Sequence, residues 1–140
     1  FHAVHYRPPA EEPDEEYPLV LTTGRNAFQY HTGTMTRRTP QLEQEMPAPY
    51  VEMHPADIAR FGLTAGGKVK VRSRRGEVEL LLVATPAIAP GTLFIPFHYA
   101  EAAANILTIR ALDPVAKIPA YKVCAVTVEP VHEQETVTAL

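Results

Sequence analysis

The residues of this chain that are able to do chemistry are scattered rather than gathered in a catalytic motif. None of the six histidines has a histidine partner at HxxxH or HExxH spacing. The chain also lacks the GxSxG, P-loop and GxGxxG patterns. The single cysteine, Cys124, excludes an internal disulfide, a CxxC zinc site and an iron–sulfur cluster held by this chain. The residues therefore give no support to an enzyme that works alone.

Polar residues instead collect in four segments that have the composition of a ligand-binding surface, namely 22–26, 29–38, 96–105 and 118–122. In the first, Gly24 lets a ligand approach the backbone, and Arg25 is able to bind phosphate as a bidentate fork. In the third, Asn105 offers the paired donor and acceptor that match the edge of a guanine or pterin ring. In the fourth, Tyr121 can stack on a planar ring and Lys122 can neutralise a phosphate. Together they predict a planar ligand with phosphates.

Each segment also has an ordinary structural interpretation. Gly24 and Arg25 also fit a turn glycine beside a solvated arginine, and Asn105 fits a helix or turn cap. Tyr121 and Lys122 also fit a strand that enters solvent. Segment 29–38 holds three threonines, His31 and two arginines, which suits a polar ligand with a pyrophosphate but also describes a long solvated loop. His98, at the end of an apolar run, is either a donor to a ligand or a histidine satisfied within the rim of a barrel. Cys124 lies in an apolar alternation, where a free cysteine usually acts as a small core residue.

Charge divides the chain into an acidic beginning and a mildly basic body. The whole has 13 basic and 16 acidic residues, a net charge of −3 and a pI near 6.1, which argues against a dedicated nucleic-acid domain. Residues 1–18 are rich in proline and hold five acidic residues between positions 11 and 16, which predicts a linker or an arm draped on the surface. We expect a domain at 19–131 and a tail at 132–140.

Short β-branched and alternating runs predict a mainly β domain with few helices, and the many polar loops favour a small closed barrel. The predicted strands are 19–23, 50–53, 68–73, 77–83, 92–97 and 122–131. Helical segments are expected at 41–46, 54–63 and 100–107, where Pro55 suits a first helical position and Gly62 a left-handed stop. The stretch 80–100 has no charged residue, but its prolines predict two buried strands rather than a membrane span.

The segments taken together resemble a known family. The pattern YPLVLTTGR…QYHTGTMTRR…HPADIARFGL…PGTLFIPFHYAEAAANILT…LDPVAKIPAYK resembles the C-terminal cofactor domain of molybdopterin-dinucleotide oxidoreductases. PFHYAEAAAN and DPVAKIPAYK bring it nearest to formate dehydrogenase large subunits. The resemblance covers about residues 17–131. It implies a double-psi β-barrel that covers one side of a bis(molybdopterin guanine dinucleotide) cofactor holding molybdenum or tungsten.

The resemblance also implies which residues meet this cofactor. They are Gly24, Arg25, His31, Thr32, Met35, His98, Asn105, Tyr121 and Lys122. Gln29 stands where relatives often carry histidine, so no contact is assigned to it. The metal ligand and the iron–sulfur cysteines are implied to lie in other domains, so we expect no catalytic residue, no metal ligand and no turnover in this chain alone. Expected partners are the remaining domains of the catalytic subunit and electron-transfer subunits, with no nucleic acid, no membrane span and a cytoplasmic location.

Three alternatives remain open at this point. The same domain could belong to a nitrate reductase-type enzyme, because little in it selects the substrate. A barrel that binds nucleic acid or protein could use the basic hairpin of residues 68–75, although those charges also fit a solvated strand face. A small barrel enzyme of the decarboxylase kind is opposed by the missing nucleophile and base.

Overall fold

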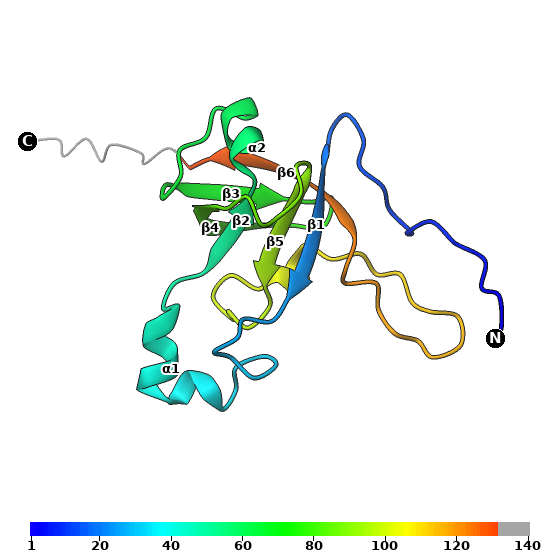
Figure 1. Cartoon of the computed structure of the whole chain (residues 1–140), viewed down its shortest axis with the longest axis horizontal. Coiled ribbons are helices and arrows are strands. Elements are labelled where there is room, and N and C mark those ends of the chain that lie inside the picture. The colour runs from blue at the N-terminus through cyan, green and yellow to red at the C-terminus, as the bar shows by residue number, and fades with distance from the viewer. Residues whose placement is uncertain (132–140) are drawn as a thin grey trace, which may run out of the picture.

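A computed structural model describes residues 1–131 and shows one closed barrel (Figure 1). Six strands form it: β1 (Leu19–Gly24), β2 (Tyr50–Met53), β3 (Lys68–Arg72), β4 (Glu77–Ala84), β5 (Thr92–Pro96) and β6 (Cys124–Pro130). They follow one another around the barrel in the order β1-β5-β2-β4-β3-β6. The six predicted strands are confirmed, with β6 beginning two residues later than expected. The predicted tail at 132–140 lies outside the described residues.

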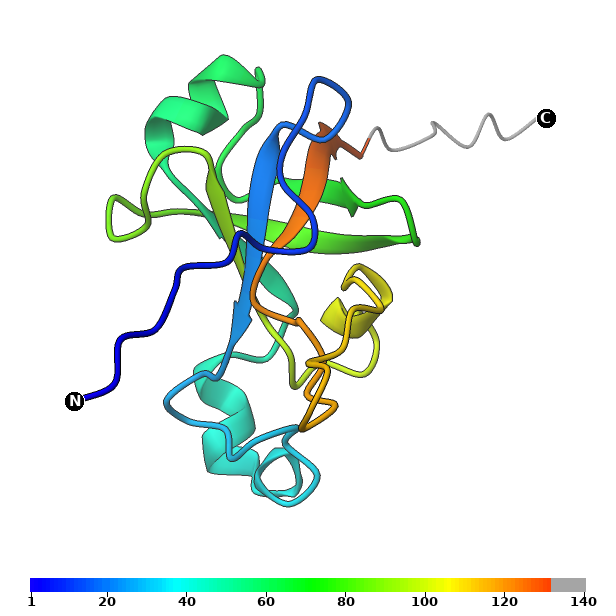
Figure 2. The same cartoon turned by 90° about the vertical axis from the view of Figure 1, so that its right-hand side faces the viewer.

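The register of the strands brings the four polar segments to one end of the barrel. β1 runs parallel to β5, and Gly24 at the end of β1 pairs with Pro96 at the end of β5. The loops that follow these two strands therefore leave the barrel side by side. β6 is antiparallel to β1, with Leu21 opposite Cys124, so the segment that enters β6 begins at this same end. Figures 1 and 2 show both long loops below the barrel, and α2 at the opposite end.

The core lies inside the barrel and is built by alternating side chains. In β3, Val69 and Val71 are buried between more exposed charged residues, and β4 repeats the pattern. β1 and β5 contribute further aliphatic side chains that are fully buried, among them Leu21 and Ile95. Burying each side chain of this size stabilises the fold by about 1.5–3 kcal/mol. One contiguous core of this chain's own residues therefore supports the barrel.

Two short α-helices are confirmed, and the helical turn predicted at 100–107 is confined to a short 3₁₀ helix. α1 (Pro40–Glu45) follows the short 3₁₀ helix η1 (Thr36–Arg38), and α2 (Pro55–Arg60) starts with Nδ1 of His54 accepting a hydrogen bond from the Ala56 amide at 3.1 Å. Within 100–107 the helical conformation is limited to the 3₁₀ helix η2 (Ala104–Ile106), because Ala103 has an extended backbone. No helix within residues 1–131 has the length and apolar character needed to cross a membrane.

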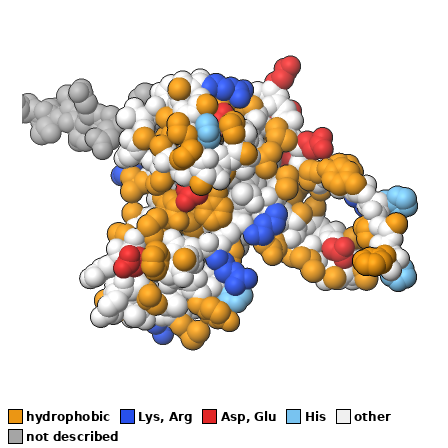
Figure 3. Space-filling model, viewed as in Figure 1, with side chains coloured by type: hydrophobic (Ala, Val, Ile, Leu, Met, Phe, Trp, Pro, Cys, Tyr) orange, Lys and Arg blue, Asp and Glu red, His pale blue; other side chains and the backbone are white. Residues whose placement is uncertain are grey.

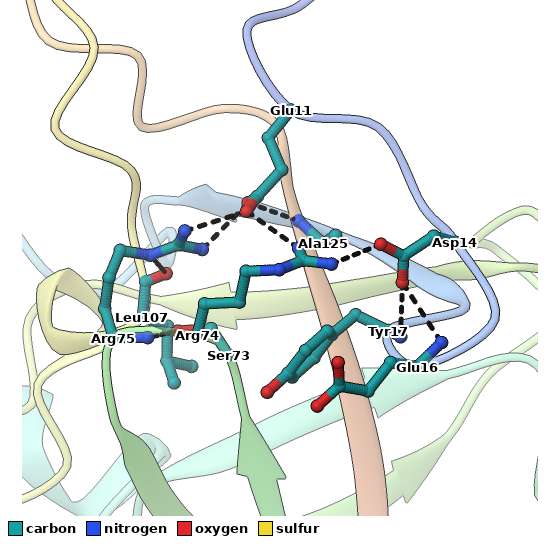
Figure 4. A network of polar contacts seen from close by, with 9 residues as sticks. All are labelled: Glu11, Asp14, Glu16, Tyr17, Ser73, Arg74, Arg75, Leu107 and Ala125. Atoms are coloured by element: carbon teal, nitrogen blue, oxygen red, sulfur yellow. Dashed lines mark hydrogen bonds and ion pairs between the residues drawn. The ribbon is translucent and has the colours of Figure 1, made fainter.

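Part of the acidic beginning of the chain is held against the barrel, as Figure 4 shows. Glu11 and Asp14 accept hydrogen bonds from Arg74 and Arg75 in the turn between β3 and β4. Tyr17 is buried beneath the guanidinium of Arg74, which lies 4.5 Å from its ring centre. Residues 11–17 lie along the barrel surface (Figure 2), where Glu11 binds Arg75 and the amide of Ala125.

Candidate functional site

A cavity of about 470 Å³ at the loop end of the barrel gathers residues from all four polar segments. We call it the central cavity. Its lining consists of Arg25, His31, Thr32, Phe97, Asn105, Tyr121 and Lys122. Six of these seven were predicted as ligand contacts from the sequence. Figure 3 shows Lys and Arg side chains, with a histidine beside one of them, on the face between the barrel and the loops below it.

The side of the central cavity next to β6 is fixed to the end of β1. The hydroxyl of Thr23 donates to the carbonyl of Tyr121 at 2.7 Å, although 98 residues separate them. The ammonium of Lys122 lies 5.0 Å from the ring centre of Tyr121. A stacking ring and a cation are thus presented together, which suits a planar group next to a phosphate.

Another part of the wall is formed by the loop after β1, which contributes Arg25, His31 and Thr32. Asn26 stiffens this loop, because its side chain accepts from the amide of Phe28 at 2.9 Å and donates to the hydroxyl of Tyr50 at 3.1 Å. His31 has a left-handed backbone with φ of 51°, within a turn closed by the Gly33 amide and the Tyr30 carbonyl. Beside Asn26, Arg25 is exposed and forms no ion pair with any described residue. Its guanidinium is therefore free to bind an anion.

Asn105 lies in η2 between the central cavity and a neighbour of about 590 Å³. Its carbonyl accepts from the hydroxyl of Thr108 at 3.0 Å, while its side-chain amide has no hydrogen-bond partner within residues 1–131. The neighbouring cavity is also lined by Arg75 and Arg110. An unpaired amide with cations on one side suits an aromatic edge that offers both a donor and an acceptor.

His98 belongs to a third cavity, of about 380 Å³, which shares Thr32 with the central cavity. The His98 side chain is only 3% exposed, and neither ring nitrogen has a partner in the described part of the chain. Burial, followed by the nearby charge of Arg37, lowers the pKa of His98. A neutral imidazole with one donor and one acceptor left unused is thus held beside the loop that follows β1.

Arg37 organises this third cavity, and sequence reasoning gave it no such role. Its guanidinium pairs with Glu43 and Glu101, each at 2.8 Å, and its carbon lies 5.3 Å from the ring centre of Tyr99. These bonds lower the pKa of both carboxyl groups. The lack of acidic residues in segment 29–38 was the available signal, because it meant that the partners of Arg37 had to come from elsewhere.

Gln29, to which no ligand contact was assigned, turns out to be a structural member of the same loop. It is buried, accepts a hydrogen bond from the Thr36 hydroxyl at 2.6 Å and donates to Glu43 at 3.3 Å. The loop is therefore braced by its own polar side chains instead of by aliphatic anchors.

Two of the nine predicted contacts do not line these cavities. Gly24 ends β1, and a Cβ atom there would lie 2.5 Å from Cε2 of Phe94, so the packing of that ring accounts for the glycine. Met35 is 67% exposed and precedes η1. Both remain close in sequence to lining residues, but the structure gives neither a place in a cavity wall.

The described residues contain neither an assembled metal-binding group nor an activated cysteine. Within residues 1–131, no three His, Cys, Asp or Glu side chains are arranged to hold a metal ion. Cys124 is buried in β6, and burial raises the pKa of its thiol to about 11. A thiol with so high a pKa is a poor nucleophile at neutral pH.

The basic hairpin that could have bound nucleic acid has several of its charges already paired. Lys70 lies 3.0 Å from Glu77, while Arg74 and Arg75 both bind Glu11. These ion pairs remove much of the positive field that phosphate backbones need. The structure therefore favours the loop end of the barrel over the hairpin as the ligand-binding surface.

Comparison with known proteins gives consistent matches. Residues 19–125 match a family model described as the Molydopterin dinucleotide binding domain. The chain is 54% identical over 127 residues to F420-dependent formate dehydrogenase 1 subunit alpha of Methanococcus maripaludis, covering 91% of this chain and 19% of that relative. It is 50% identical over 126 residues to F420-dependent formate dehydrogenase subunit alpha of Methanocaldococcus jannaschii, covering 90% of this chain and 19% of that relative.

A solved structure supports the fold. Acetylene hydratase from Pelobacter acetylenicus superposes with a TM-score of 0.80 at 21% identity, over 91% of this chain and 21% of that chain. With the closed six-strand topology, this match confirms the predicted double-psi β-barrel. The chain spans about a fifth of the length of the formate dehydrogenase subunits that it matches. Because the family model covers well over half of its residues, the chain belongs to the molydopterin dinucleotide binding domain family.

Proposed function

We propose that this chain grips a molybdopterin guanine dinucleotide as one domain of a formate dehydrogenase-type catalytic polypeptide. One observation carries the proposal: six residues, predicted independently of the structure and drawn from four distant segments, line a single cavity. The names of the two formate dehydrogenase relatives support formate over nitrate as the substrate of the complete polypeptide. The proposal extends to electron-transfer partners and a cytoplasmic location, which remain predictions.

The charges and hydrogen-bonding groups of the residues at the loop end suit such a cofactor. Arg25 and Lys122 are suited to the two phosphates, since one presents a planar fork and the other a compact charge. Asn105 has a free amide for the edge of the guanine or the pterin. His98 offers two buried ring nitrogens that lack partners among the described residues, and such orphaned groups usually meet a ligand or water.

The chain's own task is to hold and orient. The bound cofactor supplies the two-electron chemistry, through a metal whose identity, molybdenum or tungsten, this chain does not determine. Arg25, Asn105 and Lys122 fix the dinucleotide by bonds to its tail. The neutral state of His98 at pH 7 avoids adding a buried positive charge next to Arg37. No step of bond making is assigned to this chain.

The test compares site variants with a matched surface variant in the complete polypeptide. Arg25→Ala and Asn105→Ala should reduce the content of metal and of released guanine nucleotide, while Arg60→Ala, at the far end of the barrel, should not. Loss of the Asn105 amide should weaken retention by about 1–3 kcal/mol, or roughly five- to 150-fold in the dissociation constant.

Further measurements distinguish a loss of cofactor binding from a loss of folding, and formate from nitrate as the substrate. Thermal unfolding should show that each variant keeps the barrel, since Arg25 and Asn105 are exposed. Normal cofactor content in both site variants would contradict the proposed grip. Oxidation of formate by the loaded polypeptide supports the formate assignment, whereas reduction of nitrate alone would replace it with the nitrate alternative.

A further inference from the structure

The carboxylate of Glu11, on the arm that precedes the barrel, is held by a concentrated set of donors (Figure 4). Arg75 donates to both of its oxygens at 2.8 Å, Arg74 donates at 3.0 Å, and the amide of Ala125 in β6 donates at 2.8 Å. The Glu11 side chain is only 10% exposed. These donors lower the pKa of Glu11 to about 2. A carboxylate so fully bound is a fixed point of the fold, unlike its exposed neighbour Glu12.

Arg75 connects Glu11 to the ligand-binding end of the barrel. While its two terminal nitrogens bind Glu11, its Nε donates to the carbonyl of Leu107 at 2.9 Å. Leu107 is fully buried and directly follows η2, the turn that contains Asn105. One planar guanidinium thus spans the arm and the turn, and its rigid fork leaves little freedom between the two ends.

A second contact joins the same two elements. A Cβ atom on Gly76 would lie 2.4 Å from Cγ2 of Ile106, so the turn between β3 and β4 packs tightly against η2. Ile106 follows Asn105 directly in the sequence. The position of Asn105 therefore depends on the hairpin turn through both a hydrogen bond and a steric contact.

We propose that Glu11 is a positioning residue, which acts through Arg75 and the Leu107 carbonyl to hold Asn105 at the wall of the central cavity. The proposal rests on the proposed function, because it concerns the same ligand-binding turn. Glu11 itself touches none of the three cavities. The consequence is that docking of the arm and binding of the dinucleotide stabilise each other, since each orders the turn that the other needs.

A variant of Arg74 distinguishes the relay, which is the contact from Glu11 through Arg75 to Leu107, from simple attachment of the arm to the barrel. Arg74 also binds Glu11 and Asp14, but within the described chain it makes no bond to Leu107 or to any residue of η2. Loss of Arg74 loosens the arm and leaves the bridge from Arg75 to Leu107 in place. Arg75→Lys keeps a positive charge but loses the fork that reaches both sides.

The experiment measures amide hydrogen exchange and binding of guanosine 5′-diphosphate in the 140-residue chain, with circular dichroism to confirm that each variant is folded. The variants are Glu11→Gln, Arg75→Lys, Arg74→Gln and the charge-matched control Glu12→Gln. Glu11→Gln and Arg75→Lys should speed exchange of the amides of Ile106, Leu107 and Thr108 at least several-fold and weaken nucleotide binding several-fold. Glu12→Gln should change neither, and Arg74→Gln should affect η2 less than Arg75→Lys.

The exchange measurement needs no ligand, so it separates the two proposals. Unchanged exchange in η2 for both Glu11→Gln and Arg75→Lys would overturn the relay, whatever the nucleotide does. Tighter nucleotide binding by Glu11→Gln would also overturn it, because Arg75 would then be a phosphate ligand that Glu11 blocks. Faster exchange in η2 together with no nucleotide binding by the unmodified chain supports the relay and counts against the proposed function.

Discussion

The ammonium of Lys122 donates a hydrogen bond to the main-chain carbonyl of Thr23 at 2.5 Å, across 99 residues of sequence. This bond and the reciprocal one from the Thr23 hydroxyl to Tyr121 join the end of β1 to the segment that enters β6. An ammonium has three N–H donors, so one bond to a carbonyl leaves two for a phosphate. Lys122 is therefore both oriented by the barrel and available to a ligand.

This dual role predicts the outcome of Lys122→Met, which keeps the aliphatic stem and removes the charge. Binding of guanosine 5′-diphosphate, followed by calorimetry, should weaken by about 1.5–3 kcal/mol, or roughly ten- to 150-fold, because a charge-assisted bond to phosphate is lost. The matched control is Lys117→Met, since Lys117 also donates to a carbonyl, that of Pro114, but lines none of the cavities. Equal losses in the two variants would show that only the overall charge matters.

The buried His98 predicts a pH dependence of stability. Its folded pKa lies below the usual 6.5, so below that pH the unfolded chain binds a proton that the folded chain does not. The free energy of unfolding should therefore be highest above pH 6.5 and should fall as the pH drops from there toward the folded pKa. In urea unfolding at a series of pH values, His98→Gln should flatten this part of the curve, while His2→Gln, on the exposed beginning of the chain, should leave it intact.

The pKa of His98, measured by NMR titration, tests the effect of the Arg37 charge on this histidine. The Arg37 charge lowers the pKa of His98, whereas Glu43 and Glu101 raise it. Arg37→Gln should thus move the His98 pKa upward, because the two carboxylates are left unopposed. Arg38→Gln removes an equal charge from the same 3₁₀ helix and should cause a much smaller change. An unmoved His98 pKa in Arg37→Gln would mean that burial alone sets it.

Local sequence patterns predicted the strands well, because the alternation of apolar and polar side chains along a strand can be recognised from neighbouring residues alone. The alternation of Val69 and Val71, for example, needs only the side-chain period of two to be recognised. The choice of partners is a different matter. Nothing within 19–24 states that it pairs in parallel with 92–96, and this pairing is what brings the two ligand-lining loops together. The family resemblance implied a double-psi β-barrel but named no strand partners, so this pairing is known from the structure.

The site shows the same limit. Residue types in segments 22–26 and 118–122 were enough to predict Arg25 and Lys122 as lining residues, since exposed cations beside turns suit phosphate. One bracing contact escaped prediction because its partner is remote, since Arg37 binds Glu101 across 64 residues. Gly24 was assigned to a ligand, whereas the ring that requires a glycine there belongs to β5.

Gly24→Ala tests this reassignment. The new methyl group would lie 2.5 Å from Cε2 of Phe94, so the variant should lose about 1–3 kcal/mol of stability in urea unfolding. Phe94→Leu alone removes the obstructing ring, and the double variant should recover most of the loss that Gly24→Ala causes. A variant that keeps its stability but loses nucleotide binding would return Gly24 to the ligand site.

The ion pairs of Glu11 predict an acid-sensitive contribution to stability that differs in its pH window from that of His98. The pKa of Glu11 falls from its usual 4.5 to about 2 in the folded chain, so the contribution is complete above about pH 4.5 and is lost as the pH falls to about 2. At pH 7, Glu11→Gln should lower the free energy of unfolding by on the order of 2 kcal/mol, after allowance for the solvent exposure of Arg74. The gap from the unmodified chain should narrow as the pH falls below about 4.5 and close only as the pH approaches 2, while Glu12→Gln should open no gap. A gap that stays constant with pH would assign the effect to the shape of the side chain, and the arm would then be held by packing of Tyr17 rather than by the Glu11 charge.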